Sequence, residues 1–160
     1  YTGGSYSHAH ITGGNTKSML TLWKEWGVGK ALRKAYEAGV VICGISAGAM
    51  CFFDEGLSEI FPNRYTNLDC LGFLSGSFCP HYSPGKERAM IFQEQIRINK
   101  MKPGIGLEDG IALYYENGVL LEIIRSRNDA QAYHIGKIGE PEIIDIHNTA
   151  LHRTPNSRRL

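Results

Sequence analysis

A glycine-flanked serine directly after a run of β-branched residues is the feature that most restricts how this chain can fold. Residues 40–43 read Val-Val-Ile-Cys, a continuous apolar run typical of a strand buried on both faces of a parallel sheet. Residues 44–48 follow as Gly-Ile-Ser-Ala-Gly. Glycine on both sides of Ser46 suits a sharp turn from strand to helix, where nearby backbone leaves no room for side chains. We therefore expect Ser46 at such a turn, with a helix over 47–53.

The segment before this strand predicts a second strand and a helix. A short apolar stretch over 9–14 runs into Gly13-Gly14-Asn15-Thr16, which indicates a strand, a tight turn and a helix N-cap. Apolar residues then recur at helical spacing up to Ala35, with an interruption at 27–29, and Gly39 ends the helical pattern. Strand, helix and buried strand in this order form a βαβ unit.

The rest of the chain predicts further strands and one more helix. We expect irregular structure with short helical turns over 54–77, and a helix over 87–99. Strands are expected at 77–79, 105–107, 111–115, 119–123, 132–135 and 142–146, with a hairpin turn at 116–118 and a poorly ordered tail from about residue 148. The predicted fold is α/β, with a mostly parallel sheet flanked by helices and an antiparallel hairpin toward the C-terminus.

Length and charge limit the function classes that remain. The 160 residues suit a single domain over 1–160, and 17 Lys and Arg against 16 Asp and Glu leave a net charge of +1. This balance favours neither nucleic acid nor a membrane surface as a partner. No apolar run reaches the length of about 18 residues that a membrane span needs. With no basic-then-apolar leader in the sequence either, we expect a cytoplasmic location. Four cysteines without a Cys-x-x-Cys pair favour reduced, structural thiols. The sequence is compatible with a homodimer.

Ser46 is a candidate nucleophile, and His81 is the histidine best placed to act as its base. The amide of Ala47, at the start of the predicted helix, can point at an oxyanion. His81 follows Pro80 at the end of a predicted strand, where a side chain can reach a site at the sheet edge. The remaining histidines are better explained as surface or packing residues: His8, His10, His134, His147 and His152.

A base of this kind needs an acid to orient it, and the segment between Ser46 and His81 offers four. Glu59 is the first choice, and spacing leaves Asp54, Glu55 and Asp69 as alternatives.

Two further features suit an anionic ligand. The amides of the Gly13-Gly14 turn could complete an oxyanion hole, whereas the phosphate-loop patterns that would indicate a nucleotide site are absent from this sequence. Arg88, at the start of a predicted helix, could form a bidentate pair with a substrate carboxylate, or it could be a surface arginine.

Taken together, residues 11–16 (Ile-Thr-Gly-Gly-Asn-Thr), 44–49 (Gly-Ile-Ser-Ala-Gly-Ala) and 79–82 (Cys-Pro-His-Tyr) resemble the peptidase E (aspartyl dipeptidase) family, whose relatives include cyanophycinase. The resemblance covers about residues 8–118. It implies a glutamine-amidotransferase-like three-layer α/β sandwich and a serine peptidase that needs neither metal nor cofactor. It also places about two βα units before the Gly-Gly-Asn turn, so we expect the N-terminal part of the sheet to be missing here.

The resemblance also implies roles for individual residues. Ser46 matches the nucleophile and His81 the general base, and the acid falls between them, which favours Glu59. Gly14 and Ala47 match the oxyanion hole. Arg88 lies in a Gly-x-x-Arg segment that recognises the side chain of an N-terminal aspartate in the dipeptidases, and Asn15 joins it as a substrate-binding residue. The implied partner is a small peptide substrate, with N-terminal Asp dipeptides as the specific expectation.

The sequence is also compatible with one other class of function. The same fold could form a catalytically silent domain that binds a small ligand or a partner. Glutamine amidotransferase chemistry is disfavoured, because that class carries cysteine at the position of Ser46, and Cys43 lies three residues too early.

Overall fold

The computed structural model describes residues 8–62 and 64–145, and the tail expected from about residue 148 lies outside this part. Its helices and strands follow one another in this order: β1 (His8–Ile11), α1 (Thr16–Trp26), α2 (Val28–Glu37), β2 (Val41–Gly44), α3 (Ala47–Met50), β3 (Phe53–Phe61), β4 (Arg64–Asp69), β5 (Leu74–Pro80), α4 (Glu87–Arg97), β6 (Gly104–Leu107), β7 (Ile111–Glu116), β8 (Val119–Arg125), β9 (Ala132–Ile135) and β10 (Glu142–Ile143).

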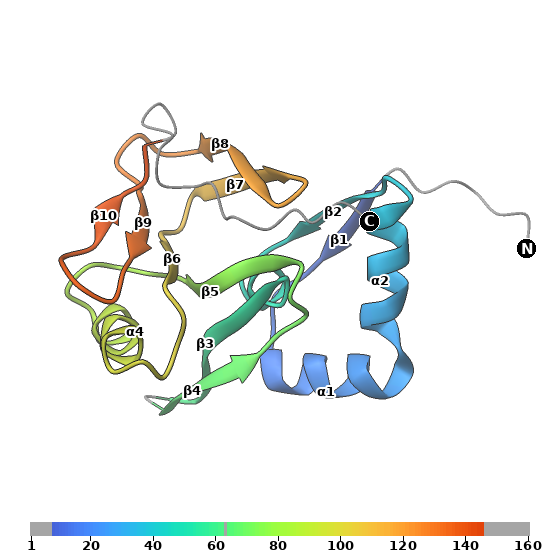
Figure 1. Cartoon of the computed structure of the whole chain (residues 1–160), viewed down its shortest axis with the longest axis horizontal. Coiled ribbons are helices and arrows are strands. Elements are labelled where there is room, and N and C mark those ends of the chain that lie inside the picture. Colours follow the sequence, from blue (N-terminus) through green and yellow to red (C-terminus); the bar gives the residue numbers. More distant parts are fainter. Residues whose placement is uncertain (1–7, 63, 146–160) are drawn as a thin grey trace, which may run out of the picture.

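The first four elements form the βαβ unit that the sequence predicts. β1 and β2 pair in parallel, and α1 and α2 connect them (Figure 1). α1 begins at Thr16 because the Asn15 side chain caps it, with Oδ1 accepting from the Ser18 amide at 2.9 Å. The two helices separate at Gly27, whose φ of 69° is a left-handed conformation that glycine adopts without strain.

A six-stranded mixed sheet forms the centre of the molecule, with the strand order β10-β9-β6-β5-β3-β4. β3, β5 and β6 are parallel neighbours, and β4, β9 and β10 pair antiparallel toward the two edges. The α/β class with parallel strands at the centre is therefore confirmed. Because β5 and β6 run side by side in the same direction, the residues that follow them meet at one edge of the sheet.

Irregular structure was expected over 54–77, and this expectation is wrong. Most of the segment is the antiparallel pair β3 and β4, followed by the start of β5. In β3 the consecutive residues Gly56, Leu57 and Ser58 are all buried. A small and a polar residue thus occupy buried positions, and the sequence lacks the alternation of apolar and polar residues by which a strand is usually predicted. A Cβ on Gly56 would overlap the side chain of Met50, and this close packing explains why glycine stands inside the strand.

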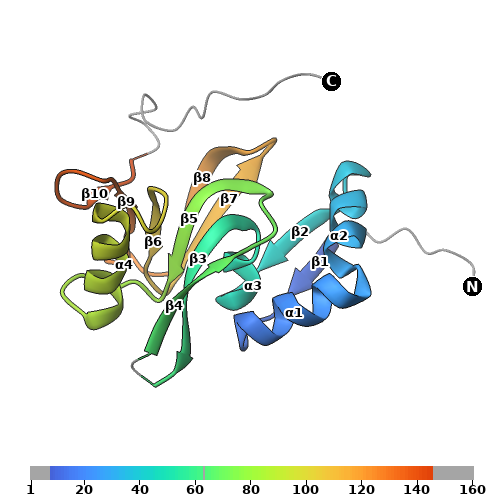
Figure 2. The ribbon, with the colours of Figure 1, turned by 60° about the horizontal axis from the view of Figure 1, so that its bottom comes forward.

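Different elements cover the two faces of the six-stranded sheet. On one face α4 packs through Phe92 and Ile96 against Leu57 and Cys79. On the other face the antiparallel β7–β8 pair packs through Leu120 and Ile123 against the sheet. Figure 2 shows α4 and the β7–β8 pair on either side of β5 and β6. A third cluster, around Leu32, Cys51 and Phe52, joins α1 and α2 to the region after α3.

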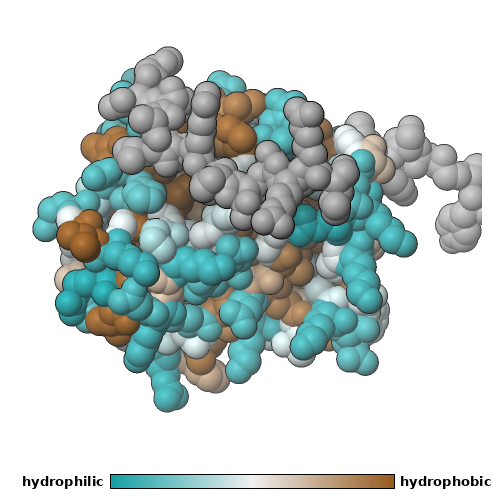
Figure 3. Space-filling view, viewed as in Figure 1, coloured by the Kyte–Doolittle hydropathy of each residue, from teal (hydrophilic) through white to brown (hydrophobic). Residues whose placement is uncertain are grey.

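The surface is mainly hydrophilic on the face drawn in Figure 3, where hydrophobic side chains form separate patches between polar ones. Among the residues that the structure describes, Ile138, at 95%, and Trp26, at 79%, are the most exposed large apolar residues. Within residues 8–62 and 64–145, the helices are all too short or too polar to cross a bilayer.

Candidate active site

Ser46 lies in the sharp turn between β2 and α3, and its backbone is strained. Its φ of 54° and ψ of −118° belong to a region that side-chain-bearing residues rarely adopt. Close packing holds the turn in place: a Cβ on Gly44 would overlap the carbonyl of Gly48, and one on Gly48 would overlap the carbonyl of Ile11. Gly13 also approaches Ser46 so closely that an added Cβ would lie 3.1 Å from the serine Cβ. The glycines around Ser46 thus allow β1, β2 and α3 to meet.

His81 follows β5 and meets the Ser46 hydroxyl. Its Nε2 lies 2.9 Å from Ser46 Oγ, within hydrogen-bond distance. The histidine backbone is also left-handed, with a φ of 56°. The next amide, that of Tyr82, donates to the carbonyl of Leu107 at 3.0 Å, which ties the turn to the neighbouring strand β6. The sequence-based pairing of Ser46 with His81 therefore corresponds to a direct contact.

Asp109 lies against the other ring nitrogen of His81. Its Oδ1 is 2.6 Å from Nδ1 of the imidazole, and the side chains of His81 and Asp109 are 48% and 72% exposed. A carboxylate can only accept a hydrogen bond, so Nδ1 carries the proton and Nε2 is left to accept from the Ser46 hydroxyl. The three side chains form one continuous chain of hydrogen bonds.

The structure does not place Glu59, the first choice of acid from the sequence, on His81. Both imidazole nitrogens are occupied by Ser46 and Asp109. Glu59 accepts instead from Nη2 of Arg88 at 2.8 Å. Among the alternatives, Asp54 accepts from the amide of Gly76 and from Lys102 Nζ, away from the histidine.

Asp109 lies outside the segment between Ser46 and His81, where the sequence motifs place the acid. The signal was present in the strand pattern, since Asp109 follows the predicted strand 105–107. β6 runs parallel to β5, with Leu107 opposite Pro80, so the residues after both strands emerge at the same edge. A parallel sheet presents its site residues at carboxyl ends of neighbouring strands, and that rule would have brought Asp109 into consideration.

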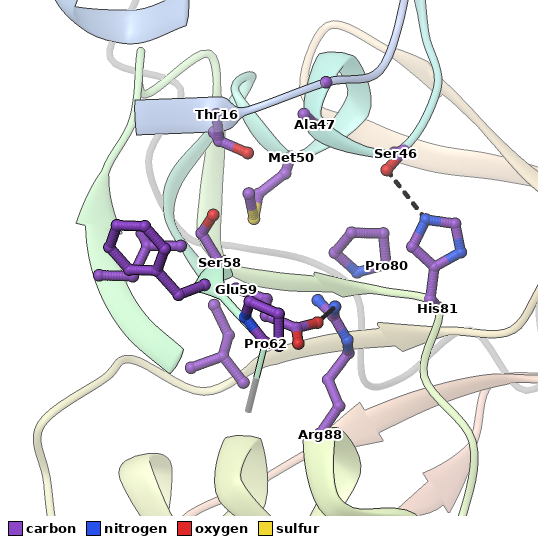
Figure 4. Close-up of a pocket in the computed structure, with 14 residues that line it drawn as sticks. Thr16, Ser46, Ala47, Met50, Ser58, Glu59, Pro62, Pro80, His81 and Arg88 are labelled. Atoms are coloured by element: carbon purple, nitrogen blue, oxygen red, sulfur yellow. Dashed lines mark hydrogen bonds and ion pairs between the residues drawn. The ribbon is translucent and has the colours of Figure 1, made fainter. Parts of the chain in front are cut away.

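A cavity of about 410 Å³ opens beside Ser46 and His81. Figure 4 shows their hydrogen bond at one side of this cavity and the Arg88–Glu59 ion pair at another. Gly14 and Ala47, the residues expected to form an oxyanion hole, lie in its wall, whereas the Asn15 side chain is engaged in capping α1. The other lining residues are Thr16, Met50, Leu57, Ser58, Ile60, Phe61, Pro62 and Pro80.

Three of the four cysteine thiols are mostly buried. Burial raises the pKa of the Cys51, Cys70 and Cys79 thiols to about 12, so these side chains stay protonated and unreactive near neutral pH. Within residues 8–62 and 64–145, His, Cys, Asp and Glu side chains form no group of three that could hold a metal ion.

Fold and geometry together define a class of α/β proteins in which strand ends present a serine, a histidine and a carboxylate in hydrogen-bonded order. Comparison with known proteins makes this assignment specific. The model of peptidase family S51 matches residues 8–123, and the chain belongs to this family. The resemblance to peptidase E that the sequence motifs indicate is thereby confirmed.

Two relatives agree with this assignment. The chain is 43% identical over 137 residues to a protein of Bacillus subtilis (strain 168) described as the uncharacterized peptidase YgaJ, covering 86% of this chain and 59% of that protein. A crystal structure assigned to peptidase E, from Listeria monocytogenes EGD-e, is similar with a TM-score of 0.56 at 24% identity, covering 76% of this chain and 60% of the other. The chain thus spans about three fifths of the length of each, and the structural match shows a shared fold.

Proposed function

We propose that this chain carries the active site of a serine peptidase that hydrolyses small peptides. The observation that supports this most directly is the hydrogen-bonded series from Ser46 Oγ to His81 Nε2 and from His81 Nδ1 to Asp109. Membership of peptidase family S51 and similarity to a B. subtilis peptidase point to the same reaction class. Asp109 takes the role of the acid in this proposal, in place of Glu59.

The proposed reaction is acyl transfer through Ser46. His81 Nε2 takes the hydroxyl proton while Oγ bonds to the peptide carbonyl carbon, and the resulting oxyanion accepts hydrogen bonds from the amides of Gly14 and Ala47. The imidazolium gives the proton to the departing amine as the peptide C–N bond breaks. Asp109 stabilises the imidazolium through Nδ1. A water molecule, deprotonated by His81, then attacks the carbonyl carbon of the acyl-enzyme. The bond between that carbon and Oγ breaks, Oγ takes the proton back from His81, and the acid product leaves.

The cavity supports a small substrate. A volume of about 410 Å³ falls in the range usual for small-molecule sites and suits one or two amino-acid residues. Arg88 in the wall is the residue that would contact an N-terminal aspartate side chain if the dipeptidase specificity applied. The side-chain oxygen of Asn15 already accepts a hydrogen bond from the Ser18 amide. In this proposal Asn15 therefore contacts the substrate through the backbone of its turn.

Replacement of the serine provides the test. We expect Ser46→Ala to lower kcat for small peptides by about 10⁴-fold or more, because the covalent step is lost. The fold should persist, as judged by an unchanged circular dichroism melt. The wild type should also be labelled stoichiometrically by a serine-directed phosphonate, and Ser46→Ala should not.

Ser75→Ala is the matched control, since Ser75 is exposed on β5 and should keep full activity and labelling. A wild-type protein that hydrolyses no peptide and resists the phosphonate would contradict the proposal. That result would favour the alternative, a catalytically silent domain that binds a small ligand or partner.

A further inference from the structure

We propose that Glu59 determines the substrate specificity of this site. By holding Arg88 in an ion pair, Glu59 makes the pocket select peptides with an uncharged residue before the cleaved bond over peptides with an acidic one. This inference rests on the proposed peptidase function, and it concerns the cavity wall rather than the reacting groups.

The ion pair lies inside the cavity that contains Ser46. Glu59 Oε2 accepts from Arg88 Nη2 at 2.8 Å, and both side chains line the same cavity as Ser46 and His81 (Figure 4). The side chains of Arg88 and Glu59 are 19% and 31% exposed, so the pair is partly removed from solvent. Charges in such a position interact more strongly than they do on an open surface.

The sheet places this pair independently of any substrate. Glu59 on β3 lies opposite Tyr65 on β4, and the Arg88 guanidinium carbon stands 5.2 Å from the centroid of the Tyr65 ring. Arg88 is thus held by a carboxylate and by an aromatic face at once. Removal of the Glu59 charge would leave the aromatic contact in place and free the guanidinium toward the cavity.

An acidic side chain entering this cavity would meet a guanidinium whose charge is already balanced. To form its own ion pair it would have to displace Glu59 from Arg88, which breaks the 2.8 Å ion pair and brings two carboxylates close together in a partly buried site. A neutral side chain avoids this repulsion, and the oxygen of a neutral amide side chain can still accept a hydrogen bond from the remaining guanidinium donors. The ion pair therefore weakens the binding of substrates that carry an acidic residue before the cleaved bond.

The test uses two substrates that differ only in charge, the p-nitroanilides of asparagine and aspartate. We expect the wild type to show at least tenfold higher kcat/KM for the asparagine compound. Glu59→Gln should raise the aspartate to asparagine ratio at least tenfold. Glu94→Gln is the matched control, because Glu94 also pairs with an arginine, Arg97, but lies exposed on α4, and the ratio should not change. A wild-type preference for aspartate, or an unchanged ratio in Glu59→Gln, overturns the inference.

A binding measurement separates this inference from the peptidase proposal. The dissociation constants of Asn-Leu and Asp-Leu are measured by calorimetry on Ser46→Ala, with and without Glu59→Gln, after thermal melts show that both variants are folded. A tenfold shift toward Asp-Leu in the double variant supports the role of Glu59 even if the wild type hydrolyses nothing. An unchanged ratio, or no binding of either peptide, overturns it even if peptidase activity is present.

Discussion

Ser46 and His81 both have left-handed backbone, with φ values of 54° and 56°. Each such residue costs of the order of 1–3 kcal/mol, which the surrounding structure must offset. For Ser46 the tight packing of Gly13, Gly44 and Gly48 restricts the alternatives, and for His81 the Tyr82 amide bonded to β6 does so. Both strained residues have side chains that hydrogen-bond at the proposed reaction centre.

Replacement of Asp109 tests the acid of the proposed triad. We expect Asp109→Asn to lower kcat by about 10³-fold or more, because an amide can donate to Nδ1 and favours the tautomer in which Nε2 carries the proton. The measurement is steady-state hydrolysis of the best small-peptide substrate. Asp129→Asn is the control, since Asp129 pairs with Arg127 on the surface and should keep activity. Equal activity in Asp109→Asn and the wild type would show that the carboxylate does not orient His81.

At the scale of elements, three strands deliver the three side chains. Ser46 follows β2, His81 follows β5 and Asp109 follows β6, so each strand positions one group at its carboxyl end. The sequence predicts the ends of β2 and β5 because an apolar run stops there at a glycine or proline. It did not predict β3, because Gly56 and Ser58 interrupt the apolar pattern of a strand that is nevertheless buried.

The strand-to-helix turn also carries a stability prediction. Gly48→Ala should destabilise the protein by several kcal/mol, because the new Cβ would overlap the backbone of β1 at Ile11 and neither backbone can move away cheaply. Urea unfolding, monitored by fluorescence, gives the free energy of unfolding of each variant. Gly136→Ala is the matched control: the nearest atom to its Cβ would be the Ile138 carbonyl oxygen, at 3.4 Å, an ordinary contact, so a change below about 1 kcal/mol is expected. Equal stability of the two variants would argue against the tight packing of the turn.

At the scale of the whole molecule, buried thiols lie in different parts of the core. Cys51 belongs to the cluster around α1 and α2, and Cys79 to the cluster beneath α4. Both are 0% exposed. Burial raises the pKa of each to about 12, from 9.0 for an ordinary thiol. Folding therefore depends on these thiols remaining protonated.

This dependence has a defined direction with pH. The unfolded chain releases thiol protons above about pH 9 that the folded chain retains, so stability falls as pH rises from 9 toward 12, by up to about 1.4 kcal/mol per pH unit for each thiol. Urea unfolding at successive pH values from 7 to 10.5 measures how steeply the free energy of unfolding falls with pH. Cys51→Ala should make the fall in stability above pH 9 less steep, by about one proton in the linkage relation. An identical pH dependence in Cys51→Ala and the wild type would contradict the claim that burial raises the pKa of the Cys51 thiol.

From the sequence alone we could predict the turn at Ser46, the parallel strand before it, the start of α1 at Thr16 and the family. Each of these depends on residues that are adjacent in the chain, where glycine spacing, apolar runs and capping side chains act locally. The carboxylates that contact His81 and Arg88 depend on how the strands are arranged in the folded protein. Asp109 stands 28 residues from His81 along the chain and reaches it because β6 lies beside β5, and Glu59 reaches Arg88 because β3 brings it to the start of α4. Spacing along the chain cannot distinguish between acidic residues of similar chemistry, because the order of strands in the sheet determines how far each carboxylate lies from His81 and from Arg88.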